Sequence, residues 1–171
     1  MISAREELIE KLAWRKPKEH FVEMCSRPEF LPFLAEICLS DDPKLNWRAA
    51  WVLSSIDVSQ LKKVFPKAQP LINTLQRKEK DGYKREIIKL IMLLDLDEDE
   101  EGAFYDAALN IWEDLALASA ARLYALRGML HIAKLYPELN HEIAAYNDDH
   151  YLQGVSPGIQ SQMRKIFKDL S

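Results

Sequence analysis

Apolar residues recur along most of the chain at the spacing of three and four positions that is typical of α-helices. The clearest run is Asn46–Asp57, in which Ala49, Leu53 and Ile56 fall on one helical face. Strand signals are nearly absent, because the pair Asp81-Gly82 opens a long run of helical period instead of joining two alternating runs. The pattern therefore predicts an all-α fold.

Caps and prolines set the expected helix boundaries. Ser3 and Glu6 form a capping box, and Asp42-Pro43 is a strong helix start. Pro66 should bend or break the helix that contains it. Ten helices, and so about five antiparallel hairpins, are expected: from 3 to about 14, 17–28, 28–37, 42–57, 61–77, 82–94, 103–115, 119–135, 138 to about 152, and 156 to the end.

A basic residue returns near the start of alternate helices. Arg48, Arg85 and Arg122 lie 37 residues apart, a period at which stacked helical hairpins form a solenoid. No stretch rich in glycine, serine or proline marks a second domain. We therefore expect residues 1–171 to form one repeat domain.

The segment Trp47-Arg48-Ala49-Ala50-Trp51-Val52-Leu53 resembles the second helix of a HEAT-type or armadillo-like repeat. The resemblance covers most of the chain and implies a right-handed α-α superhelix that binds macromolecules. With segments 136–139 and 156–166, the chain is also similar to small bacterial HEAT-like proteins, some of which are labelled adenylosuccinate lyase.

Catalytic motifs are missing from the sequence. The lyase superfamily has a loop resembling G-S-S-x-M-P-x-K-x-N, of which Ser54-Ser55 match only the serine pair. The glycine-rich phosphate motifs and the G-x-S-x-G nucleophile elbow are also absent. We therefore expect a protein that is not an enzyme and needs no cofactor.

Composition and charge narrow the choice of partner. With 48% hydrophobic and 29% charged residues, the chain should fold by itself. The net charge is +3 over residues 1–80 and −7 over 81–171, which makes nucleic acid an unlikely partner for the whole surface. The sequence shows no membrane span and no secretory signal, and Cys25 and Cys38 are expected to be reduced thiols. We therefore expect a cytoplasmic protein.

The candidate contact surface combines tryptophan and arginine, which give much of the binding energy at protein interfaces. We expect a protein or peptide to bind there, on the concave face of the solenoid. Two alternatives remain open: the next repeat covers the indoles, and the arginines pair internally, Arg85 with Asp81 and Arg48 with Asp41 or Asp42. The candidate residues are Trp47, Arg48, Trp51, Arg85, Arg122 and Arg127.

Two groupings resemble metal sites but lack the required spacing. Asp95–Glu101 contains six carboxylates, without the pattern of an EF-hand, and is better explained as a loop before a helix start. His141, Asp148 and His150 do not share one helical face. We expect no metal at either place.

Two further functions stay open at this stage. HEAT-like DNA glycosylases use tryptophan and a carboxylate in a cleft, which Trp47, Trp51 and Asp57 loosely imitate. Alternatively, the chain is a subunit of a larger assembly. Such a subunit would bind the assembly through an outer face of the solenoid.

Overall fold

The computed structural model describes residues 3–13, 20, 27–77 and 80–170, and these residues contain helices and no strands. The predicted all-α fold is confirmed. The chain divides into two compact units, residues 1–96 (unit 1) and 97–171 (unit 2). Most of the second predicted helix, residues 17–28, falls outside the described residues.

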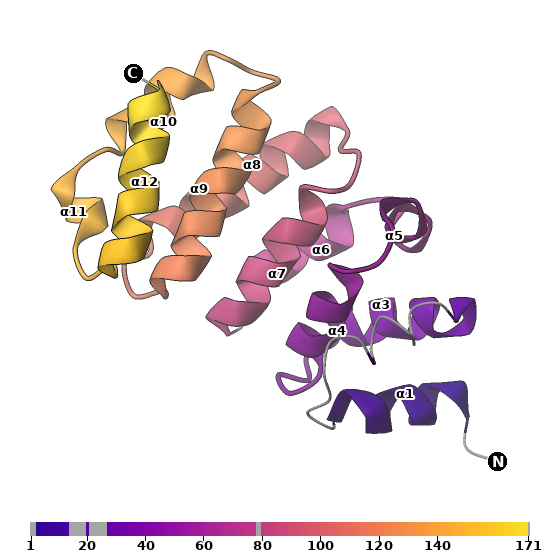
Figure 1. Cartoon of the computed structure of the whole chain (residues 1–171). Helices are drawn as coiled ribbons and strands as arrows, with labels where there is room; N and C mark the ends of the chain where they lie inside the picture. The colour runs from indigo at the N-terminus through magenta and orange to yellow at the C-terminus, as the bar shows by residue number, and fades with distance from the viewer. Residues whose placement is uncertain (1–2, 14–19, 21–26, 78–79, 171) are drawn as a thin grey trace. The chain divides into compact units, whose positions relative to one another are not determined.

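Unit 1 is built from helical hairpins. The elements are α1 (Ala4–Ala13), the 3-10 turn η1 (Pro28–Phe30), α3 (Leu31–Leu39), α4 (Asn46–Leu53), α5 (Val58–Val64), α6 (Gln69–Leu75) and α7 (Asp81–Ile91). Helix α4 packs against α3 and against α7, and α7 packs against α6, so the two second helices α4 and α7 are neighbours (Figure 1).

Helix α4 begins at Asn46, four residues later than predicted from the Asp42-Pro43 pair. The Asp42 carboxylate accepts a hydrogen bond from the backbone amide of Lys44 at 2.8 Å. The side chain therefore closes a turn ahead of the helix, which is a common role of aspartate, rather than capping it. Around Pro66 the predicted break is real, since α5 ends at Val64 and α6 begins at Gln69.

Unit 2 contains five helices among its described residues. They are α8 (Glu98–Glu113), α9 (Ser119–Ala133), α10 (Leu139–Ala145), α11 (Asp149–Leu152) and α12 (Pro157–Leu170). Helices α8 and α9 form the main hairpin, and α10 and α12 both pack against α9 (Figure 1). The single helix predicted for 138–152 is two, because Asp148 caps a separate α11 by accepting from the amide of His150 at 2.7 Å.

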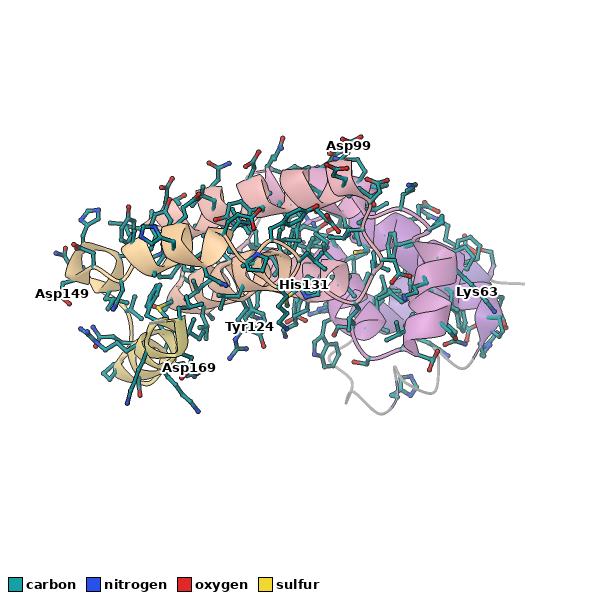
Figure 2. All side chains as sticks on the ribbon, turned by 90° about the horizontal axis from the view of Figure 1, so that it is seen from above. Lys63, Asp99, Tyr124, His131, Asp149 and Asp169 are labelled. Carbon is teal, nitrogen blue, oxygen red and sulfur yellow. The ribbon has the colours of Figure 1, made fainter. Side chains whose placement is uncertain are left out.

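The acidic run forms the start of α8. Asp97 accepts from the backbone amide of Glu100 at 3.0 Å, and Glu100 accepts from the amide of Asp97 at 3.2 Å. This capping box starts the helix five residues before the predicted Ala103. Figure 2 shows Asp99 at this end of α8, where negative charge stabilises the exposed backbone amides.

A buried polar residue lies in the first turn of the second helix in three hairpins, α3–α4, α6–α7 and α8–α9. Asn46, Lys84 and Arg122 are 1%, 7% and 1% exposed, and they lie 38 residues apart. Each donates to a carbonyl at the end of the preceding helix: Asn46 to Ser40 at 3.3 Å, Lys84 to Leu75 at 2.5 Å and Arg77 at 2.8 Å, and Arg122 to Trp112 at 2.9 Å.

The last carbonyls of a helix have no partner within it and carry the negative end of the helix dipole. A buried donor at this place satisfies them and links the two helices of the hairpin. The structural repeat is therefore set by Asn46, Lys84 and Arg122. The period is 38 rather than 37. The predicted series was displaced, because Arg48 lies two residues after Asn46 and Arg85 lies one residue after Lys84.

Candidate protein-binding surface

The repeat register identifies which positions of the second helices reach the surface. In unit 1, the positions one and five residues after the buried donor are half-buried on both α4 and α7. The position between them, two residues after the donor, is half-buried Arg48 on α4. We call the resulting set the second-helix face of unit 1: Trp47, Arg48 and Trp51 on α4, with Arg85 and Lys89 on α7.

A buried carboxylate organises the cations of α7. The side chain of Glu86 is 2% exposed and lies 3.0 Å from the guanidinium of Arg85 and 3.0 Å from the Lys89 ammonium. The two cations are 38% and 30% exposed. Burying a carboxylate is costly unless it is paired, and here two cations meet one anion. The cluster therefore keeps a net positive charge at the surface.

Arg48 connects the face to the end of α1. Its Nη1 donates to the carbonyls of Leu12 at 2.5 Å and Ala13 at 2.9 Å, and its guanidinium lies 5.5 Å from the centre of the Trp47 ring. The prediction that Arg48 pairs internally with Asp41 or Asp42 named the wrong partner, because Arg48 bonds to backbone carbonyls of α1. Asp41 instead pairs with Arg77 at 2.7 Å.

A groove adjoins Trp47 at the start of α4. It has a volume of about 470 Å³, and Lys44, Trp47, Arg48 and Lys80 line it together with Asp42. Three cations thus face one carboxylate around an indole. Sequence analysis did not select Lys44, Lys80 or Lys89. The only signal for Lys89 was its spacing of four from Arg85, which places both on one side of the helix.

Trp51 is half-buried, and its backbone carbonyl accepts the hydroxyls of Ser54 at 2.7 Å and Ser55 at 3.4 Å. The serine pair that imitates the lyase loop therefore satisfies a helix end. Asp57 caps α5 by accepting from the Ser59 amide at 2.8 Å, and the hydrogen bonds from Ser59 lower its pKa. Ser54, Ser55 and Asp57 therefore have structural roles at the end of α4 and the start of α5.

Unit 2 changes the assignment of Arg122. The side chain is buried, Nη2 also donates to the Tyr151 carbonyl at 2.7 Å, and the guanidinium lies 4.9 Å from the Trp112 ring. Burial lowers the pKa of Arg122. The prediction that Arg122 contacts a partner is corrected, because a residue this deeply enclosed holds the helices together.

Arg127 occupies the half-buried position of α9 that corresponds to Trp51 and Lys89. Its Nη2 donates to Gln162 at 3.1 Å, and its guanidinium lies 4.8 Å from the ring of Tyr124. Tyr124 lies along α9 (Figure 2). Arg127 is therefore a surface residue of unit 2 that also bridges α9 and α12.

Within the described parts of the chain, no three His, Cys, Asp or Glu side chains gather closely enough to hold a metal. Cys38 is buried and unpaired with sulfur, and burial raises the pKa of its thiol; Cys25 falls outside the described residues. No helix in those described parts has the length and apolar content needed to span a membrane.

A family model described as HEAT repeat domain matches residues 4–170. The chain belongs to the HEAT repeat family. HEAT repeats are helical scaffolds that commonly mediate protein–protein interactions, and the family is generally not enzymatic. No curated protein and no solved structure matches the chain.

Proposed function

We propose that this HEAT repeat protein is a non-enzymatic scaffold that holds an acidic segment of a partner protein on the second-helix face of unit 1. The observation that supports the proposal is the meeting of two half-buried indoles with a surplus of cations. Across the face and the adjoining groove, five cations (Lys44, Arg48, Lys80, Arg85, Lys89) stand against two carboxylates (Asp42, Glu86).

The chemistry suits a peptide that carries both charge and an apolar side chain. Half-buried indoles lose little conformational freedom on binding, and tryptophan is enriched among the residues that dominate interface energies. Cations around them favour carboxylates and speed the encounter. We place this surface on the concave side of the repeat stack, in a cytoplasmic protein, as the sequence led us to expect.

A binding experiment tests the proposal most directly. A fluorescein-labelled peptide of alternating glutamate and leucine is titrated with the full chain, and polarisation is measured. The test variants are Trp47→Ala and Lys44→Glu/Lys80→Glu. Arg48 is left intact, because its replacement would also remove its hydrogen bonds to the end of α1.

The matched control is Lys165→Glu/Lys168→Glu, which makes the same change in charge on the exposed side of α12. We expect about a tenfold loss of affinity in each test variant and little change in the control. Equal affinities across all of them would refute the assignment. Submicromolar binding of mixed-sequence duplex DNA, falling steeply with salt, would favour the nucleic-acid alternative instead.

The absence of lyase activity is also part of the proposal. Ser54 donates to the backbone carbonyl of Trp51, and among the described residues no hydrogen bond joins it to a base that could activate its hydroxyl. We expect no turnover of adenylosuccinate by the purified chain. Reproducible turnover that disappears in Ser54→Ala would show that the protein is an enzyme.

A further inference from the structure

Glu86 is a buried carboxylate next to the cations of the second-helix face. Its side chain is 2% exposed, and Tyr83, Ile87 and Leu90 of the same helix are fully buried. A carboxylate in such surroundings is costly unless it is paired and its oxygens accept hydrogen bonds. The groups that bind Glu86 therefore account for an anion at this position.

One oxygen of Glu86 joins two cations. Oε1 accepts from Arg85 Nε at 3.1 Å, from Arg85 Nη2 at 3.0 Å and from Lys89 Nζ at 3.0 Å, and Oε2 accepts from Lys89 Nζ at 3.2 Å. Because Nη2 and Nζ each lie 3.0 Å from the same oxygen, these two nitrogens are no more than about 6 Å apart.

The two cations would separate without this shared anion. Arg85 and Lys89 are four residues apart on α7, and like charges at that spacing repel each other. Both side chains are also long and lose rotamer freedom when they are held in one place. Glu86 opposes both effects, and it holds the pair at the surface, where the two side chains are 38% and 30% exposed.

The held pair is suited to one more carboxylate. Among the described residues, Glu86 accepts from Nε and Nη2 of Arg85, so Nη1 keeps its donors for a ligand. Two cations and one anion leave a single positive charge, which one further carboxylate neutralises. Charge-assisted hydrogen bonds from a guanidinium or an ammonium to a carboxylate are the stronger kind.

We infer that Glu86 is a positioning residue, which holds Arg85 and Lys89 together as one site for a single aspartate or glutamate carboxylate of the partner segment. The inference rests on the proposed function and names the atoms that meet the acidic side chain. Glu86 acts through the two cations, whose ordering before binding lowers the entropy cost of the complex.

The sign of a mutational effect separates this role from simple charge. An anion on a face that binds an acidic segment repels that segment. If charge alone mattered, removing the Glu86 carboxylate would therefore tighten binding. If Glu86 positions the two cations, removing the carboxylate weakens binding although the face becomes more positive.

The test uses the full chain and the fluorescein-labelled peptide of alternating glutamate and leucine. Glu86→Gln keeps the size of the side chain, and we expect it to weaken peptide binding about fivefold. The matched control is Glu36→Gln, which removes a carboxylate on α3 that pairs with Arg5 of α1. The control should stay within about twofold of wild type.

Two further variants separate positioning from a folding defect. Glu86→Asp keeps the charge but withdraws it by one methylene, so it should also weaken binding. In a Lys89→Met background only one cation remains to be held, and Glu86→Gln should cause no further loss there. A damaged scaffold would lower affinity in both backgrounds. Thermal melts followed by circular dichroism verify that each variant is folded.

The outcomes distinguish this inference from the proposed function. If the wild type binds the peptide and Glu86→Gln binds it equally or more tightly, the role of Glu86 is overturned and the proposed function stands. A loss of the same size in the Lys89→Met background would assign Glu86 to the scaffold and would also overturn the role. No measurable binding by the wild type would refute the proposed function, and the inference with it.

Discussion

Replacing Arg122 with methionine tests the part of the fold that sequence analysis misjudged. The guanidinium is enclosed in unit 2 and donates to the carbonyls of Trp112 and Tyr151 at 2.9 and 2.7 Å. Methionine has a similar length and fills much of the same space, but it has no donor. The substitution therefore removes the two hydrogen bonds with little change in volume.

The size of the effect follows from these contacts. Leaving a buried acceptor unsatisfied costs about 1–3 kcal/mol, and two carbonyls lose their donor. The lost attraction to the Trp112 ring adds up to about 2 kcal/mol when desolvated. Removing a buried cation offsets part of this, because burial already disfavours the charge and lowers the pKa of Arg122. We expect a net loss of about 3 kcal/mol.

Thermal melts measured by circular dichroism provide the assay. For a chain of this length, a loss of about 3 kcal/mol lowers the midpoint by roughly 6–12 °C. Arg127→Met is the matched control, because it removes the same group from a half-buried position of the same helix. It should cost less than about 1 kcal/mol.

Arg122→Lys refines the test. In Arg122 two different nitrogens reach the two carbonyls, whereas lysine has a single donor group. Lysine should keep one bond and recover about half of the stability lost in methionine. If Arg122→Met melts within about 2 °C of wild type, the guanidinium does not link these helices, and our assignment of the repeat register is wrong.

Two more measurements probe packing and electrostatics in unit 2. Gly128→Ala would place a Cβ 2.9 Å from the buried Phe104 ring, so we expect a loss of about 1–2 kcal/mol in urea unfolding. Gly102→Ala meets nothing within 4 Å and should gain about 0.5–1 kcal/mol; similar changes in both would contradict the packing argument. Burial and Glu113 raise the pKa of Tyr146 to about 12, above roughly 10 in the unfolded chain. Its stabilising effect is therefore complete below pH of about 10 and lost as the pH approaches 12. Glu113→Gln should lower this pKa in an ultraviolet titration, and an unchanged titration would refute the Tyr146–Glu113 contact.

The helices were predictable because their signals are local. Apolar spacing predicted α9, and its boundaries agree within two residues at either end. The start of α4 was misplaced because the sequence Asp42-Pro43 suits both a helix cap and a turn, and only the tertiary structure selects the turn. The extra break before α11 depends on Asp148, whose capping role resembles that of any loop aspartate in sequence.

The binding surface was harder to predict because arginine serves two purposes in this fold. Arg85 and Arg122 look alike in sequence, each near the start of a second helix. Arg85 is 38% exposed along its side chain, whereas Arg122 is enclosed. A one-residue difference in register separates them, and sequence periodicity does not resolve one residue. The hydrogen bonds of Tyr105, Tyr136 and Tyr146 to glutamates join positions more than thirty residues apart. No local sequence pattern therefore predicts them.

Lys84 and Lys89 allow the two roles to be separated within one helix. Lys84 occupies the buried register position of α7 and donates to the carbonyls of Leu75 and Arg77, while Lys89 lies half-buried on the second-helix face. Lys84→Met should therefore cost about 2–3 kcal/mol of stability, since two carbonyls lose their donor.

Lys89→Met should leave stability nearly unchanged, because Arg85 still pairs with Glu86, and should weaken binding of the glutamate peptide about threefold. Urea unfolding and polarisation are measured on both variants. If the register is right, Lys84→Met loses stability, whereas Lys89→Met loses affinity for the glutamate peptide. A different outcome is that Lys89→Met loses as much stability as Lys84→Met while peptide affinity is unchanged. The position five residues after the buried donor would then belong to the scaffold, and the second-helix face would not be a binding surface.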